Sequence, residues 1–219
     1  MIPYGRQHID KNDIQNVLNV LNSSYLTQGK ITPKFEKKIL KYTNSKYSLT
    51  CNSGTSALHI ACLSLNLMPG DRVWTSPNSF LASANCIEYC GGVVDFVDIN
   101  FETGNLSLTH LEEKLIKANK NNTLPKIIIP VHFAGNPTDQ VQIWKLSKKY
   151  GFKIIEDASH AIGGSYESYP VGSCKYSQIT VFSFHPVKII TSGEGGVATT
   201  NNIEIENKLK LLRSHGITK

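Results

Sequence analysis

Apolar and polar residues follow two alternating periods along this chain. Stretches with an apolar residue every three or four positions predict amphipathic helices. These stretches are 11–22, a segment starting at 33, 54–67, 79–90, 108–118, 138–151 and 203–213. Between them, short apolar runs rich in Val, Ile and Thr predict strands. These runs are 47–51, 72–76, 93–99, 126–133, 153–158, 179–184 and 196–200.

Local signals mark the ends of several predicted helices. Asp10 is the expected N-cap of the first helix, whose apolar positions share one face. Thr32 is expected to cap the second helix, with Pro33 in the first helical position. Thr138 and Gly151 are expected to begin and end the sixth helix.

The alternation of strand and helix predicts an α/β fold. A mainly parallel sheet with helices on both faces, a three-layer α/β/α arrangement, satisfies this order. The run at 126–133, KIIIPVHF, is apolar at most of its positions, which is typical of a strand buried on both faces. Ligands in such folds bind at the carboxyl ends of the strands. Functional residues are therefore expected in the loops that follow the strands.

Charge and hydropathy narrow the class of protein. The formal net charge is +6, but the lysines are scattered over predicted helix faces and form no basic stripe. This distribution disfavours nucleic-acid binding and suits an anionic small substrate. The sequence contains no apolar run of 18 residues and no signal-peptide pattern at its start. We therefore expect a soluble, cytoplasmic protein without a membrane partner.

The five cysteines give no sign of a metal or disulfide site. Their number is odd and no CxxC pair occurs, which disfavours zinc ribbons, redox pairs and disulfide frameworks. We expect them to be small buried residues of a protein in a reducing compartment, and we expect no metal site.

Two of the strand-end loops have features that suit a flat, phosphorylated ligand. Gly54, Thr55 and Ser56 lead directly into a helix, and a helix N-terminus attracts anions. An ordinary capping sequence is the alternative interpretation. Phe80 follows the strand at 72–76 and is placed to cover a flat ring, although a core aromatic is the alternative.

A third loop carries a carboxylate and an imidazole. Asp157 ends an apolar strand, where a buried carboxylate requires a cation or hydrogen-bond donors, and His160 follows three residues later. An aspartate can hold a protonated ring nitrogen, and a nearby histidine can reach a ring oxygen. The alternatives are a helix cap for Asp157 and a core histidine for His160. A Ser-His-Asp hydrolase is disfavoured because no GxSxG sequence occurs.

The fourth loop places Lys188 between an apolar strand and a glycine-rich turn. A desolvated lysine amine is a nucleophile that forms a Schiff base with a carbonyl group. Ser183 precedes it by five residues and offers a hydroxyl to a phosphate. A solvated surface lysine is the alternative interpretation.

Together, the four loops suit one cofactor. A phosphate site, a stacking aromatic, a carboxylate for a pyridine nitrogen and a Schiff-base lysine are what pyridoxal phosphate requires. All four lie where the predicted fold brings strand ends together.

Five segments then identify the chain as similar to a known family. In order and spacing it resembles the DegT/DnrJ/EryC1/StrS sugar aminotransferases, which have the type I, aspartate-aminotransferase-like fold. The segments are YLTQGKITPKFE, NSGTSALHIAC, EDASHAIGG, VGSCKYSQITVFSFHPVKIITSGEGG and LRSHGIT.

The resemblance implies a role for each candidate residue. It makes Lys188 the residue that binds the pyridoxal phosphate aldehyde and moves protons, Asp157 the partner of the pyridine nitrogen, and His160 a neighbour of the ring hydroxyl. It also implies that Phe80 stacks on the ring. The remaining residues would bind the phosphate, with Gly54 allowing close approach; they are Gly54, Thr55, Ser56 and Ser183.

The resemblance also implies a reaction. Lys188 stands where the dehydratase branch of the family has histidine, which favours transamination. MIPYGRQHID, DFVDI, PVHFAGNP and SFHPVKIITSGEGG look like a subgroup that makes a UDP-4-amino sugar for pseudaminic acid. L-glutamate would donate nitrogen to a UDP-4-keto-6-deoxy amino sugar. A GDP- or dTDP-4-keto-sugar aminotransferase and an inactive, ligand-binding remnant are the alternatives.

Family members are almost twice as long as this chain. Residues 1–219 are therefore expected to be a partial cofactor-binding large domain, with an N-terminal arm at 1–32, a core at 33–219 and the C-terminal small domain missing. The family forms homodimers whose sites lie at the subunit boundary, so the resemblance also implies a homodimer.

Overall fold

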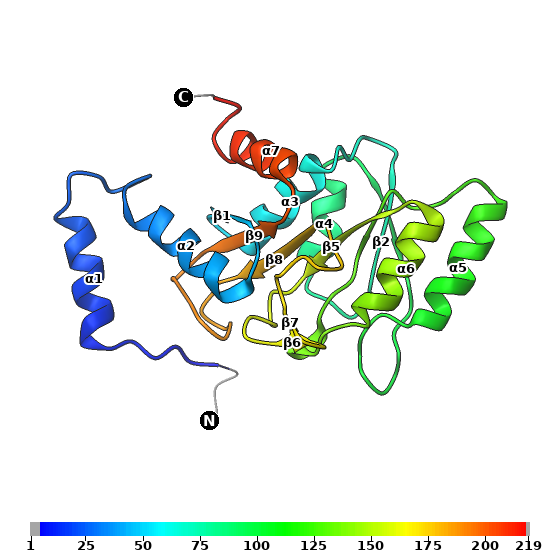
Figure 1. Cartoon of the computed structure of the whole chain (residues 1–219), viewed down its shortest axis with the longest axis horizontal. Helices are drawn as coiled ribbons and strands as arrows, with labels where there is room; N and C mark the ends of the chain where they lie inside the picture. The colour runs from blue at the N-terminus through cyan, green and yellow to red at the C-terminus, as the bar shows by residue number, and fades with distance from the viewer. Residues whose placement is uncertain (1–4, 218–219) are drawn as a thin grey trace.

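The computed structural model describes residues 5–217, and most of this chain forms one mixed sheet with helices on both sides (Figure 1). The described part excludes residues 1–4 and 218–219. The first of these ranges opens the segment MIPYGRQHID, which was compared above with the pseudaminic acid subgroup. The helices are α1 (Lys11–Leu21), α2 (Ile31–Thr43), α3 (Gly54–Ser64), α4 (Ala82–Glu88), α5 (Leu108–Lys120), α6 (Gln140–Tyr150) and α7 (Ile203–Arg213). A 3-10 turn covers Phe133–Gly135.

The main sheet has seven strands in the order β1-β9-β8-β5-β4-β2-β3. They are β1 (Tyr47–Cys51), β2 (Arg72–Thr75), β3 (Val93–Phe96), β4 (Ile127–Ile129), β5 (Lys153–Asp157), β8 (Ile179–Ser183) and β9 (Gly196–Thr200). The pairs from β3 through β2, β4 and β5 to β8 are parallel, whereas β9 is antiparallel to both β8 and β1. The mainly parallel sheet is confirmed, with β9 reversed. A small hairpin, β6 (Ser165–Tyr166) and β7 (Tyr169–Pro170), was not predicted.

The short strand β4 shows how the three layers form. Side chains alternate between the two faces of a strand. Ile127 and Ile129 belong to an apolar cluster with residues of α3, α4 and α7. Ile128 belongs to a second cluster on the opposite face, with residues of α5 and α6. All three isoleucines are fully buried, so the predicted burial on both faces is confirmed.

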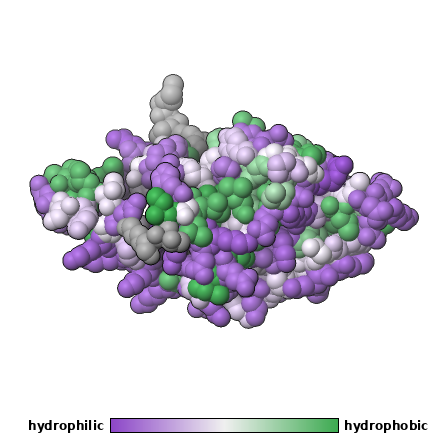
Figure 2. Space-filling model, turned by 90° about the horizontal axis from the view of Figure 1, so that it is seen from above, coloured by the Kyte–Doolittle hydropathy of each residue, from purple (hydrophilic) through white to green (hydrophobic). Residues whose placement is uncertain are grey.

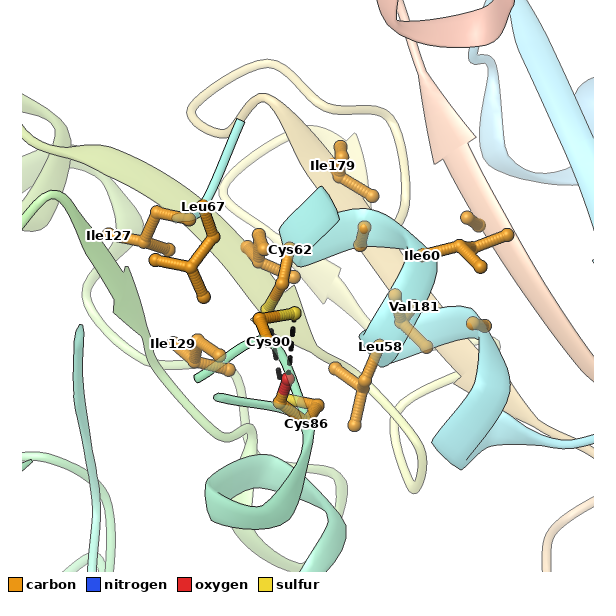
Figure 3. Close-up of a cluster of buried hydrophobic side chains, with 14 of the residues drawn as sticks. Leu58, Ile60, Cys62, Leu67, Cys86, Cys90, Ile127, Ile129, Ile179 and Val181 are labelled. Atoms are coloured by element: carbon orange, nitrogen blue, oxygen red, sulfur yellow. Dashed lines mark hydrogen bonds between the residues drawn. The ribbon is translucent and has the colours of Figure 1, made fainter. Parts of the chain in front are cut away.

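The cysteines pack as small core residues. Cys62 of α3 lies against Cys86 of α4 with their sulfur atoms 3.8 Å apart, and the Cys90 thiol donates to the Cys86 carbonyl oxygen at 3.3 Å (Figure 3). Cys174 is also buried and Cys51 is partly buried, and all five are free thiols. Burial raises the pKa of the Cys174 thiol to about 11. It is therefore protonated at neutral pH, as expected of an inert core residue.

Three predicted helix starts are wrong by one to three residues. α4, expected from residue 79, begins at Ala82. α2 begins at Ile31, so Pro33 is the third helical residue, where its missing N–H would still have had no partner within the helix. The N-cap of α6 is Asp139, whose carboxylate accepts from the backbone N–H of Gln142 at 3.1 Å. Thr138 cannot cap α6 because it is turned toward His132, to whose Nδ1 its backbone N–H donates at 3.2 Å.

The first helix is confirmed but lies apart from the core (Figure 1). Asp10 caps α1 and forms a capping box with Asp13. The apolar face of α1 is exposed and forms a hydrophobic patch at one end of the molecule (Figure 2). It consists of Ile14, Val17, Leu18 and Leu21. Within the described residues, no helix combines the length and apolar character needed to cross a bilayer.

Candidate active site

A cavity of about 860 Å³ opens at the carboxyl ends of the parallel strands. This size is within the range of small-molecule sites. Seven of the eight residues predicted from the sequence line it: Gly54, Thr55, Phe80, Asp157, His160, Ser183 and Lys188. They come from separate loops, so the fold brings them together as the sequence predicts.

The reversed strand β9 explains how Lys188 reaches this cavity. Because β9 is antiparallel to its neighbours, its first residue, Gly196, lies at the edge where β8 ends, and it pairs with both Ser183 and Cys51. The segment between β8 and β9 is closed by backbone bonds from Phe184 N–H to the Gly195 carbonyl oxygen and from Ser192 N–H to the Phe184 carbonyl oxygen. The loop bearing Lys188 is therefore held at the carboxyl edge of the sheet.

Asp157 is a buried carboxylate at the end of β5, with 4% of its surface exposed. Its Oδ1 accepts from the Ser159 hydroxyl at 2.6 Å and from the Ser159 backbone N–H at 3.1 Å. Its Oδ2 accepts from the Ser83 hydroxyl at 2.6 Å. Three donors offset the cost of burying this polar group and fix its orientation at the cavity.

Lys188 and His160 are in direct contact. The Nζ of Lys188 lies 2.5 Å from the Nε2 of His160, and both side chains are partly buried. Burial lowers the pKa of Lys188, and the charge of Asp157 opposes that shift. Burial also lowers the pKa of His160, helped by the charge of Lys188 and opposed by Asp157. The amine and the imidazole share one hydrogen bond, and the tautomer of the imidazole decides which of them donates it.

These directions predict an unusually reactive lysine. An amine attacks electrophiles only when unprotonated, so in the chain without cofactor acylation of Lys188 should rise with pH through a midpoint below that of an ordinary lysine. Asp157→Asn removes the charge that raises the pKa, so the midpoint should fall further. Competitive acetylation read by mass spectrometry measures the Lys188 midpoint in the unaltered chain and in Asp157→Asn, with the exposed Lys11 as internal reference. A Lys188 midpoint at or above that of Lys11 would contradict the burial argument.

The N-terminus of α3 forms one wall of the cavity. A Cβ atom on Gly54 would lie 2.9 Å from the Cβ of Ser183, so the close approach of α3 to the end of β8 requires glycine. Thr55 lies in the first turn beside this contact. Ser56 does not line the cavity, and its N–H donates to the hydroxyl of Ser53, the N-cap, at 3.1 Å. The capping interpretation thus accounts for Ser56, while Gly54 and Thr55 face the cavity.

Phe80 is 74% exposed and lines the cavity mouth, which excludes a core role. Sequence reasoning missed three other polar residues here. Ser83 and Ser159 hold Asp157, and the buried His132 lines the cavity while its backbone N–H donates to the Asp157 carbonyl oxygen at 3.0 Å. The position of Ser159 two residues after Asp157 suits a local hydrogen-bonded turn and was a usable signal. Ser83 is 74 positions from Asp157 and gave none.

Residues 7–219 match the DegT/DnrJ/EryC1/StrS aminotransferase family. This chain belongs to that family. A UDP-4-amino-4,6-dideoxy-N-acetyl-beta-L-altrosamine transaminase of Campylobacter jejuni is 42% identical over 219 residues, which are 100% of this chain and 56% of that protein. The chain thus spans little more than half the length of the curated relatives it matches.

Two solved structures share the fold. Helicobacter pylori PseC, an aminotransferase involved in the biosynthesis of pseudoaminic acid, matches with a TM-score of 0.90 and 37% identity over 99% of this chain and 57% of that one. The PLP-form of a putative sugar aminotransferase, Spr1654 from Streptococcus pneumoniae, matches with a TM-score of 0.87 and 28% identity over 99% of this chain and 59% of that one. The expected aminotransferase fold and family are confirmed.

The cavity fits pyridoxal phosphate, the cofactor of this family. An amine of lowered pKa, a carboxyl group with its own hydrogen-bond donors and a helix N-terminus face one space of suitable volume. These groups match an aldehyde, a protonated ring nitrogen and a phosphate. Among the described residues there is no group of three or more His, Cys, Asp or Glu side chains placed to hold a metal ion.

Proposed function

We propose that this chain is the cofactor-binding part of an aminotransferase that moves an amino group from L-glutamate to a UDP-4-keto-6-deoxy amino sugar. The observation that carries the proposal is the joint placement of Lys188, His160 and Asp157 in one cavity. The sugar is proposed from the relatives at 37–42% identity, whose names refer to UDP-4-amino sugar or pseudoaminic acid synthesis. Cytoplasmic location and a homodimer are part of the same proposal.

Each residue has a proposed task. Lys188 would hold the aldehyde through Nζ, with loss of water, and would carry a proton to and from the reacting carbon. Asp157 would orient the ring and hold a proton on its nitrogen, and the cofactor would supply an electron sink for that carbon. His160, which contacts Lys188, would form a hydrogen bond with the ring hydroxyl. Phe80 would cover the ring and exclude water.

The phosphate is proposed to bind at the start of α3. The backbone N–H of Thr55 and the hydroxyl of Ser183 are offered as donors, and the positive end of the helix dipole adds attraction. Gly54 keeps this turn close to Ser183. Ser56 can contribute its N–H only by giving up the bond from that N–H to Ser53.

Two measurements test the proposed function. The purified chain, incubated with pyridoxal phosphate and reduced with borohydride, should carry the cofactor mass on the peptide containing Lys188. A separate sample, loaded with the cofactor but not reduced, should convert L-glutamate to 2-oxoglutarate once per site and aminate a UDP-4-keto-6-deoxy sugar in preference to GDP- and dTDP-linked ones. Loading without amination would support a cofactor-binding remnant, and absence of loading would refute the proposal.

A further inference from the structure

The carboxylate of Asp157 is held from two different elements. Ser159 lies on the same loop as Asp157 and moves with it. Ser83 lies on α4, and its hydroxyl donates to Oδ2 at 2.6 Å. Ser83 is 0% exposed, so this bond is shielded from water. Ser83 is therefore the contact that ties the carboxylate to a second element of the fold.

Charge determines the direction of these bonds. An ionised carboxylate only accepts hydrogen bonds, so the Ser83 proton points at Asp157. The oxygen of Ser83 is then free to accept, and the hydroxyl of Ser79 lies 2.6 Å away. Ser79 lines the cavity. A chain of two hydroxyls thus runs from the cavity wall to the carboxylate.

We infer that Ser83 is a positioning residue that fixes the orientation of the Asp157 carboxylate and keeps it ionised opposite the cofactor ring. This inference rests on the proposed function. Without Ser83, Oδ2 has lost its donor in a buried site, and the charged form of the carboxylate is disfavoured. A carboxylate that is less readily ionised, or that turns toward another donor, holds a proton on the ring nitrogen less firmly.

The test is the titration of that ring nitrogen. The chain is loaded with ¹⁵N-labelled pyridoxal phosphate, and the nitrogen chemical shift is followed with pH. In Ser83→Ala the nitrogen should lose its proton at a pH about one unit lower than in the unaltered chain, the size expected for one lost hydrogen bond to a charged group. Covalent attachment at Lys188 should persist. Ser83→Thr keeps the hydroxyl and should restore the original midpoint.

Ser64→Ala is the matched control. Ser64 is a buried helical serine whose hydroxyl donates to the Ala61 carbonyl oxygen at 2.8 Å, away from the cavity. Its removal should leave the nitrogen titration unchanged. If Ser83→Ala fails to fold, Ser83→Cys keeps a similar shape with a weak donor and should show the same downward shift.

The outcomes separate the two claims. An unchanged midpoint in folded Ser83→Ala or Ser83→Cys overturns the role of Ser83 and leaves the proposed function intact. An equal shift in Ser64→Ala also overturns it, because the effect would then be general. Failure of the unaltered chain to form the borohydride-stable adduct at Lys188 overturns the proposed function and this inference with it.

Discussion

Lys188→Ala is expected to abolish covalent attachment of pyridoxal phosphate. Nζ of Lys188 is the amine in the cavity that contacts His160, and burial lowers its pKa. Without it, the aldehyde has no nucleophile held beside the ring site, and the proton carrier of the transfer step is also lost. Amino transfer should fall by at least about 100-fold, the lower end for losing a general acid–base. Borohydride trapping with mass spectrometry measures the attachment, and single-turnover assays with L-glutamate on separate, unreduced samples measure the transfer.

Two further variants distinguish the loss of the amine nucleophile from the loss of a positive charge. Lys188→Arg retains a cation but forms no carbon–nitrogen double bond with the aldehyde, so it should also fail to be trapped. Lys175→Ala removes an exposed lysine that lies over the Tyr169 ring, outside the cavity, and should load normally. Normal trapping in Lys188→Ala, at whatever site, would show that another amine binds the cofactor.

Gly196→Ala is expected to cause the largest loss of stability. A Cβ at this position would lie 2.2 Å from the carbonyl oxygen of Ser53 and 2.6 Å from the backbone nitrogen of Gly54. Both are backbone atoms, so relief requires moving β9 away from the start of α3. We expect the free energy of unfolding to fall by about 3 kcal/mol or more, the upper part of the range for overpacking. Urea unfolding followed by circular dichroism measures it.

The same substitution should also weaken phosphate binding at the proposed site, because the displaced residues are those that begin α3. Gly5→Ala is the matched control. Its Cβ would meet Val187 at 3.8 Å, an ordinary contact, so unfolding should change by less than about 0.5 kcal/mol. If Gly196→Ala unfolds at the same urea concentration as Gly5→Ala, the close packing of β9 against α3 is wrong.

The exposed face of α1 shows one limit of a sequence pattern. The spacing of Ile14, Val17, Leu18 and Leu21 predicts a helix, and the helix is present. The same spacing does not state what covers the apolar face, because periodicity reports which residues share a face and contains nothing about the neighbour. In the described residues that face is exposed.

In the candidate site, some residues could be assigned from the sequence and others only from the structure. Asp157, His160 and Lys188 could be found from the sequence because each lies at or shortly after the carboxyl end of an apolar strand. The carboxyl ends of parallel strands lie at one edge of the sheet. Ser56 was assigned with Thr55, since adjacent positions in a helix start look alike in sequence. The cap formed by Ser53 distinguishes them, because it engages the N–H of Ser56.

Local periodicity and turn residues were enough to predict the alternation of strands and helices, and with it the loops that hold the candidate site residues. Only the folded chain shows that β9 runs antiparallel to its neighbours and that Ser83 reaches Asp157. Strand direction and such long-range bonds depend on how distant segments pack, and no local pattern encodes that packing. The position of Lys188 beside His160 is the product of both: a local loop, brought to the cavity by a reversed strand.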